Sequence, residues 1–166
     1  MAYIDWTADN DLGIAEIDRQ HRRLVEIVNR LYDAMEQRCP KFAMQGVVCD
    51  LVTYTEIHFA FEERLMQRLD FPDRESHRNE HWTMTNEVRK FEEALTNGRL
   101  CVSLELMDFL KGWLLNHVMH ADWQLARHAH GSQDMVGPGG QPFREIEHFL
   151  QPRASIVMRT GLGPHQ

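Results

Sequence analysis

Residues 51–69 read LVTYTEIHFAFEERLMQRL. Apolar and aromatic residues recur in this stretch at spacings of three and four, which is the period of one face of an α-helix: Leu51, Tyr54, Leu65 and Leu69. His58 and Glu62 fall on the same face, four positions apart, so an imidazole and a carboxylate lie one turn above each other. We therefore predict a helix that carries two metal-competent side chains into a core.

Three further segments show the same helical period. Together the four predicted helices cover residues 18–38, 42–69, 74–96 and 103–129. Asp73 is a plausible N-cap for the third helix, and Asn97-Gly98 is a C-terminal stop signal after it. The intervening segments have the short lengths that join antiparallel neighbours, and strand-like alternation is nowhere sustained. The predicted fold is all-α, an antiparallel up-down-up-down four-helix bundle.

The two ends of the chain differ from the helical part. We expect Trp6, Leu12 and Ile14 to pack as an N-terminal arm over a bundle domain that spans residues 1–130. Residues 131–166 contain Gly137-Pro138-Gly139-Gly140 and a second glycine-rich run, so we predict a C-terminal tail with a short helix near residues 143–150.

Composition excludes several classes of function. The chain has 166 residues, 43 % hydrophobic, a formal charge of −7 and no apolar run near the roughly 20 residues of a membrane helix. We expect no membrane insertion, and no nucleic-acid partner because a basic face is missing. The N-terminus carries acid and lacks the apolar segment of a secretory signal, so we expect a cytoplasmic protein. Three widely spaced cysteines suggest reduced thiols rather than a disulfide framework or thiolate zinc site.

Every predicted helix places a metal-competent side chain on its apolar face. His21 lies at the start of the apolar face of the first helix, and His77 and His81 lie one turn apart on that of the third. His117 comes directly after the apolar residues of the fourth helix. The complete set is His21, His58, Glu62, His77, His81, His117 and Asp122. Buried ionised groups are costly unless something compensates them, and metal ions would do so. Seven donors are too many for one tetrahedral zinc and suit two bridged metals, but ligand chemistry alone admits iron, zinc, copper or nickel.

The spacing between His117 and Asp122 is irregular. Residues five apart on a regular α-helix are rotated by about 140° from each other. Either the helix is locally distorted, as π-bulges at functional sites are, or Asp122 reaches the site from the flank. On geometry alone His120 is an equal candidate.

The motifs taken together resemble the haemerythrin family, in particular its single-domain bacterial members, over residues 3–129. They are Trp6, Gly13-Ile14, Ile17-Asp18-x-Gln20-His21-x-x-Leu24, His58-Phe59-x-x-Glu62-Glu63-x-x-Met66, His77-x-x-x-His81, and Leu110-x-x-Trp113-Leu114-x-x-His117-x-x-x-x-Asp122. All seven ligand positions of the family are filled, including the five-residue step to Asp122.

The resemblance implies a non-haem di-iron centre. It assigns His77, His81 and His117 to one iron, His21 and His58 to the other, and Glu62 and Asp122 to both as bridges, with an oxo or hydroxo group as third bridge. The two-histidine iron then has an open position for dioxygen. The family's apolar oxygen pocket corresponds to Leu24, Phe59, Trp113 and Leu114.

The function implied by the resemblance is reversible dioxygen binding for storage, transport or delivery to an acceptor that the sequence does not identify. Neutral imidazoles favour oxygen carriage, whereas carboxylate-rich di-iron sites favour oxygenation, and we expect no enzyme. The alternative functions are those of an enzyme acting on peroxide or nitric oxide and of an oxygen- or redox-sensing module. The remaining histidines and four further charged residues are expected to be solvated or tail residues: His120, His128, His130, His148, His165, Glu63, Arg64, Glu92 and Glu93.

Overall fold

A computed structural model describes residues 2–99 and 101–131. The described residues form helices and connecting turns, with no strand among them. The elements are η1 (Ala8–Asn10), α1 (Ala15–Glu36), α2 (Lys41–Arg68), α3 (Arg74–Thr96), α4 (Leu104–His117), η2 (Val118–Asp122) and α5 (Trp123–Ala129). The element η2 is a π-helical turn, and it joins α4 to α5 without a break in the helical path.

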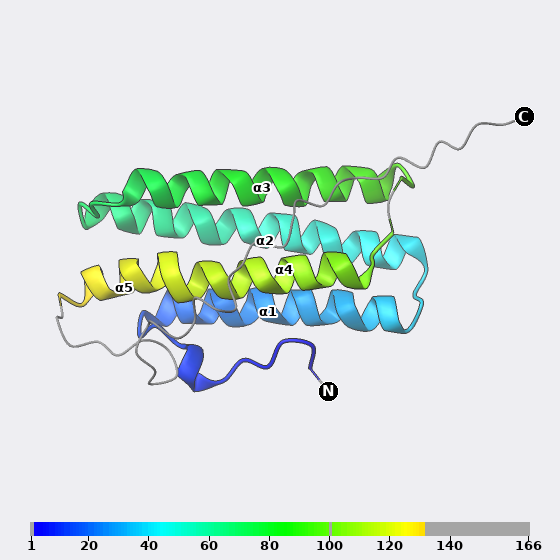
Figure 1. Ribbon diagram of the computed structural model, residues 1–166, viewed down its shortest axis with the longest axis horizontal. Coiled ribbons are helices and arrows are strands. Elements are labelled where there is room, and N and C mark those ends of the chain that lie inside the picture. The colour runs from blue at the N-terminus through cyan, green and yellow to red at the C-terminus, as the bar shows by residue number, and fades with distance from the viewer. Residues whose placement is uncertain (1, 100, 132–166) are drawn as a thin grey trace, which may run out of the picture.

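The four long helices lie side by side, and the chain direction reverses at each connection (Figure 1). Helix α2 packs against both α1 and α3, and α4 packs against α1. The predicted all-α four-helix bundle is confirmed. Among the residues described, no helix is long and apolar enough to cross a membrane.

Helix α1 begins at Ala15, three residues before the predicted start, because Asp18 serves the preceding turn instead of starting the helix. Its two carboxylate oxygens accept the backbone N–H groups of Leu12 at 2.6 Å and Gly13 at 3.0 Å. Gly13 has a φ of 81°, a conformation that glycine adopts without strain. These contacts attach the segment before α1 to the first turn of the helix.

The other predicted ends lie within two residues of the observed ones. Helix α1 ends at Glu36, two residues before Arg38, and α2 is displaced by one residue at each end. Asp73 precedes α3 as predicted, but its side chain forms no capping hydrogen bond. Ser103 does cap α4, since its hydroxyl accepts the N–H of Leu106 at 3.4 Å.

The segment before α1 packs on the bundle, and Ile4 and Leu12 are buried there. The N–H of Ile4 donates to Asn29 at 2.8 Å, and the ring of Tyr3 stacks on Tyr32. At the other end of the chain, the predicted tail beyond residue 131 and its short helix near residues 143–150 lie outside the described residues.

The buried face of α2 is shifted by about one position from the predicted stripe. Thr55 and Met66 are buried, whereas Tyr54, Leu65 and Leu69 are only partly buried. The shift arises because α2 contacts two neighbouring helices, so its buried face is centred between them. The stripe predicted on α3 is buried throughout: His77, His81, Met84, Val88, Phe91 and Leu95.

Candidate metal centre

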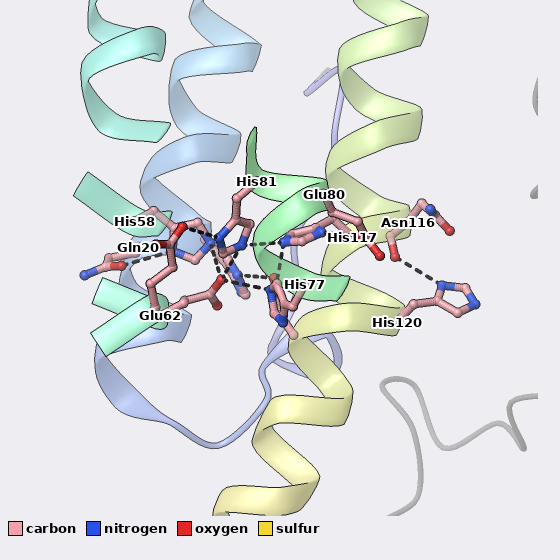
Figure 2. A network of polar contacts seen from close by, with 12 residues as sticks. Gln20, His58, Glu62, His77, Glu80, His81, Asn116, His117 and His120 are labelled. Atoms are coloured by element: carbon pink, nitrogen blue, oxygen red, sulfur yellow. Dashed lines mark hydrogen bonds and ion pairs between the residues drawn. The ribbon is translucent and has the colours of Figure 1, made fainter. Parts of the chain in front are cut away.

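The structure brings all seven predicted ligand residues together in the bundle core. None is more than 3 % exposed: His21, His58, Glu62, His77, His81, His117 and Asp122. They come from α1, α2, α3 and the continuous helical segment α4–η2, so each of the four helices of the bundle contributes at least one donor. Figure 2 shows the rings of His58, His77, His81 and His117 and the Glu62 carboxylate pointing toward one another.

One group of donors has the spacing of a single coordination sphere. It consists of Glu62, His77, His81, His117 and Asp122, each with one donor atom within 4.8 Å of all the others. The Nε2 atoms of His77 and His117 both lie 3.1 Å from Asp122 Oδ1, and His81 Nε2 lies 3.1 Å from Glu62 Oε2. Ligands about 2.1 Å from a metal ion and at right angles to each other are about 3.0 Å apart. These distances therefore fit the edges of one octahedral site.

A second group shares its carboxylates with the first. It consists of His21, His58, Glu62 and Asp122. His21 Nε2 lies 3.0 Å from Asp122 Oδ2, and His58 Nε2 lies 3.7 Å from Glu62 Oε2. Asp122 thus presents Oδ1 to the first group and Oδ2 to the second. Glu62 and Asp122 are therefore common to both groups.

The π-helical turn resolves the irregular spacing between His117 and Asp122. A turn that closes from i to i+5 brings residues five apart to the same side of the helix. The alternative of a local distortion is therefore correct, and Asp122 does not approach from the flank. His120 points away from the cluster, and its Nδ1 lies 3.1 Å from the carbonyl oxygen of Asn116 (Figure 2).

Three further residues contact the outer ring nitrogens of the histidines. Gln20 Oε1 lies 3.0 Å from Nδ1 of His58, Glu63 Oε1 lies 3.4 Å from Nδ1 of His81, and Glu80 Oε2 lies 3.0 Å from Nδ1 of His117. Glu63, predicted to be solvated, is 36 % exposed, but one of its oxygens also faces a buried histidine. The sequence interpretation assigned no role to the other two.

A sequence signal narrows the search for these residues but does not identify them. Each is the chain neighbour of a cluster residue: Gln20 precedes His21, Glu63 follows Glu62, and Glu80 precedes His81. Neighbours on a helix are rotated by 100°, so when one points to the bundle axis the other can point along the interface with an adjacent helix.

The hydrogen-bonding pattern tests whether the donor set fits a metal. Nδ1 of His81 and Nδ1 of His117 each face a carboxylate, and the Nε2 atoms of the two rings lie 3.1 Å apart inside the cluster. A contact this short between two ring nitrogens needs a proton or a metal ion between them. Both oxygens of Glu62 are also buried without a hydrogen-bond partner among the described residues. The residues fit a metal cluster.

Electrostatics in the metal-free chain lead to the same conclusion. Burial alone would lower the pKa of His77 and His117, but the nearby carboxylates of Asp122 and Glu62 outweigh it and raise these pKa values to about 9 and about 10. Burial acts to raise the pKa of Glu62, but the surrounding histidines lower it to about 2. The centre therefore stabilises positive charge, whether protons or metal ions supply it.

An apolar cavity of about 20 Å³ is lined by residues of α1, α2, α3 and α4. Leu24, Phe59, Trp113 and Leu114, the four predicted pocket residues, all line it. Phe59 stacks on the ring of His81 with centroids 3.8 Å apart, and Trp113 stacks on His117 at 4.7 Å. The rings of Phe59 and Trp113 therefore lie between the cavity and two histidines of the cluster.

Known proteins resemble this chain in both fold and sequence. Residues 12–129 match the family described as Hemerythrin HHE cation binding domain. Bacteriohemerythrins from Pseudomonas aeruginosa and Stenotrophomonas maltophilia are 36 % and 35 % identical over 122 residues, which cover 74 % of this chain and 78 % of each relative. A wild-type hemerythrin crystal structure matches with a TM-score of 0.69 and 25 % identity, covering 74 % of this chain and 94 % of that protein. The chain belongs to the haemerythrin family.

Proposed function

We propose that the seven buried donors hold two non-haem iron ions and that the chain binds dioxygen reversibly there. The proposed ligands are His77, His81 and His117 for one ion, His21 and His58 for the other, and Glu62 and Asp122 for both. The observation that carries the proposal is the convergence of two donor groups that share these two carboxylates. Five imidazoles and two carboxylates suit two ions of high coordination number better than one tetrahedral ion.

An iron pair held by these residues would supply two electrons, and the ion held by His21 and His58 would offer the position for dioxygen. The chain's own residues control access to that position. We expect dioxygen to approach it from the apolar cavity that Leu24 and Leu114 line. Among the lining residues, only Thr55 and Trp113 have a polar group in the side chain. A cavity of about 20 Å³ is close to the volume that one water molecule needs, but its walls offer few polar partners, so water is poorly stabilised. A small apolar gas fits these walls better.

The same residues support carriage rather than catalysis. No carboxylate, histidine or lysine is among the residues that line the cavity, so no described side chain there is placed to give or take a proton. Neutral imidazoles also outnumber carboxylates in the donor set, which favours returning dioxygen unchanged. We infer a role in oxygen storage, transport or delivery.

Metal analysis and turnover assays test this proposal together. Protein made in iron-sufficient cells should contain two irons per chain and should show slow turnover with hydrogen peroxide and nitric oxide. Two zinc ions per chain, or one iron, would rule out the proposed centre. Rapid, sustained turnover with either substrate would instead assign an enzymatic function to the same residues.

A further inference from the structure

The outer contacts of the histidines form a directional series around the bundle. Gln20 on α1 contacts His58 on α2, Glu63 on α2 contacts His81 on α3, and Glu80 on α3 contacts His117 on α4. In each case one helix supports a cluster histidine of the next helix along the chain. The supporting groups therefore depend on the packing of neighbouring helices.

The supporting groups differ in charge between the two donor groups. In the first group, His81 and His117 each face a carboxylate, whereas Nδ1 of His77 has no hydrogen-bond partner among the described residues. His58, which belongs to the second, faces the neutral amide oxygen of Gln20, and Nδ1 of His21 has no hydrogen-bond partner among the described residues. The negative outer groups are thus confined to one of the two positions.

This difference changes the donor strength of the inner nitrogens. An imidazole whose outer N–H donates to a carboxylate becomes a more basic ligand and is fixed in one tautomer and orientation. A hydrogen bond to a charged acceptor is also stronger than one to a neutral amide. Glu63 is itself anchored, because its Oε2 lies 3.4 Å from Nε of Arg78. The side chain of Glu80 is 48 % exposed and has the shorter contact.

We propose that Glu63 and Glu80 are positioning residues that make the three-histidine position the tighter of the two metal positions, so that metal enters it first and leaves it last. The two-histidine position, supported by Gln20, is the exchangeable one. This inference rests on the proposed two-metal site and adds an order of loading to it.

Chelator competition with the fully loaded, reduced protein under anaerobic conditions tests the order. A colorimetric ferrous chelator in excess should remove the two irons in two phases of equal amplitude. Glu80→Gln should accelerate the slow phase by about 10- to 100-fold, the usual effect of losing an outer partner of a metal-binding histidine, and should leave the fast phase unchanged. Glu80→Asp, which keeps the charge, should restore part of the difference.

A second variant tests the other metal position by moving a negative charge along α1, from residue 16 to residue 20. Gln20 Nε2 donates to Glu16 Oε1 at 2.5 Å. The double variant Glu16→Gln with Gln20→Glu exchanges the two side chains, so the net charge stays the same and the new carboxylate at residue 20 still has an amide beside it. It should slow the fast phase. Glu87→Gln is the matched control, because Glu87 lies on the same helix as Glu80 and pairs with Lys90 on the surface.

The position filled first can be identified separately. One equivalent of Co²⁺ added to the metal-free chain should give three shifted, solvent-exchangeable ring N–H signals in the proton NMR spectrum, as expected for His77, His81 and His117. Two such signals would overturn the proposal, as would two irons that leave in a single phase or an equal change of both phases in Glu80→Gln. A chain that never holds two irons would instead refute the di-iron site itself.

Discussion

His117 Nε2 and Asp122 Oδ1 lie 3.1 Å apart, although five positions separate the two residues along the chain. The π-helical turn over Val118–Asp122 produces this contact, since it places residues five apart on one side of the helix. The same turn leaves His120 outside the cluster, beside the carbonyl oxygen of Asn116.

Alanine substitutions should separate Asp122 from His120. Asp122→Ala removes a donor from both groups and should lose at least one iron per chain. His120→Ala should retain both irons and change the free energy of unfolding by about 0.5 kcal/mol or less, as is usual away from a core or a site. Metal analysis and thermal unfolding of both variants measure this. Loss of iron in His120→Ala but not in Asp122→Ala would show that His120, and not Asp122, is the metal ligand.

Glu62→Ala should be the most damaging substitution on α2. It removes a carboxylate shared by both donor groups and leaves two cations with less negative charge between them. We expect the loss of at least one iron and a large fall in the melting temperature, because metal binding is coupled to folding. Glu56→Ala is the matched control, because Glu56 pairs with Arg89 at the surface and such pairs contribute about 1 kcal/mol or less. Equal iron contents in the two variants would contradict the bridging role.

The metal-free chain should be most stable near pH 6.5. The pKa values of His77 and His117 are raised to about 9 and about 10, so their stabilising contribution is complete below pH 6.5 and is lost as the pH rises through those values. Burial lowers the pKa of His58 to about 4, so its contribution is present above pH 6.5 and is lost as the pH falls toward 4.

Thermal unfolding of the metal-free chain between pH 4 and pH 10 measures this dependence. The metal-loaded chain serves as the comparison, since its histidines are neutral ligands and protons compete with metal only at low pH. We expect a falling melting temperature above pH 7 for the metal-free chain alone. A flat profile from pH 6.5 to pH 9 would show that the histidines are not held by the carboxylates as described.

The fold and six of the seven cluster residues could be predicted from the sequence because they depend on local periodicity. His77 and His81 illustrate this, since a spacing of four on an apolar face determines both their burial and their direction. Six of the seven donors lie on a stripe that the bundle must bury, whereas Asp122 was assigned from the family resemblance.

The supporting residues could not be predicted in the same way. Glu63 and Glu80 are partly exposed and act across helix interfaces, so their role depends on which helices are neighbours and on the rotation of each. Tyr54 was placed on the buried face because a stripe read from one helix cannot show that α2 packs against two neighbours. The spacing of His117 and Asp122 indicated an irregularity, but only the structure identifies it as a π-helical turn.

Leu114→Ala should impair the oxygenated form without emptying the site. The substitution enlarges the cavity beside the cluster enough to admit water. A buried leucine truncated to alanine costs about 2 to 5 kcal/mol, which a bundle held together by metal should survive. Oxidation of the oxygenated protein, followed optically, should be faster than in the wild type at an unchanged iron content.

Leu106→Ala is the control for Leu114→Ala. Leu106 is buried on the same helix but does not line the cavity. It should lower stability without changing the oxidation rate. Equal oxidation rates in the wild type and in fully metallated Leu114→Ala would show that Leu114 is only a core residue.

The central claim, reversible dioxygen binding at a di-iron centre, is tested most directly by the optical spectrum of the reduced protein before air, after air and after vacuum. The donor set and the apolar cavity predict a nearly colourless reduced form, new visible absorption in air, and return to the starting spectrum when oxygen is removed. The cycle should repeat with little loss. An unchanged spectrum in air, or a change that vacuum does not reverse in freshly oxygenated protein, would contradict it.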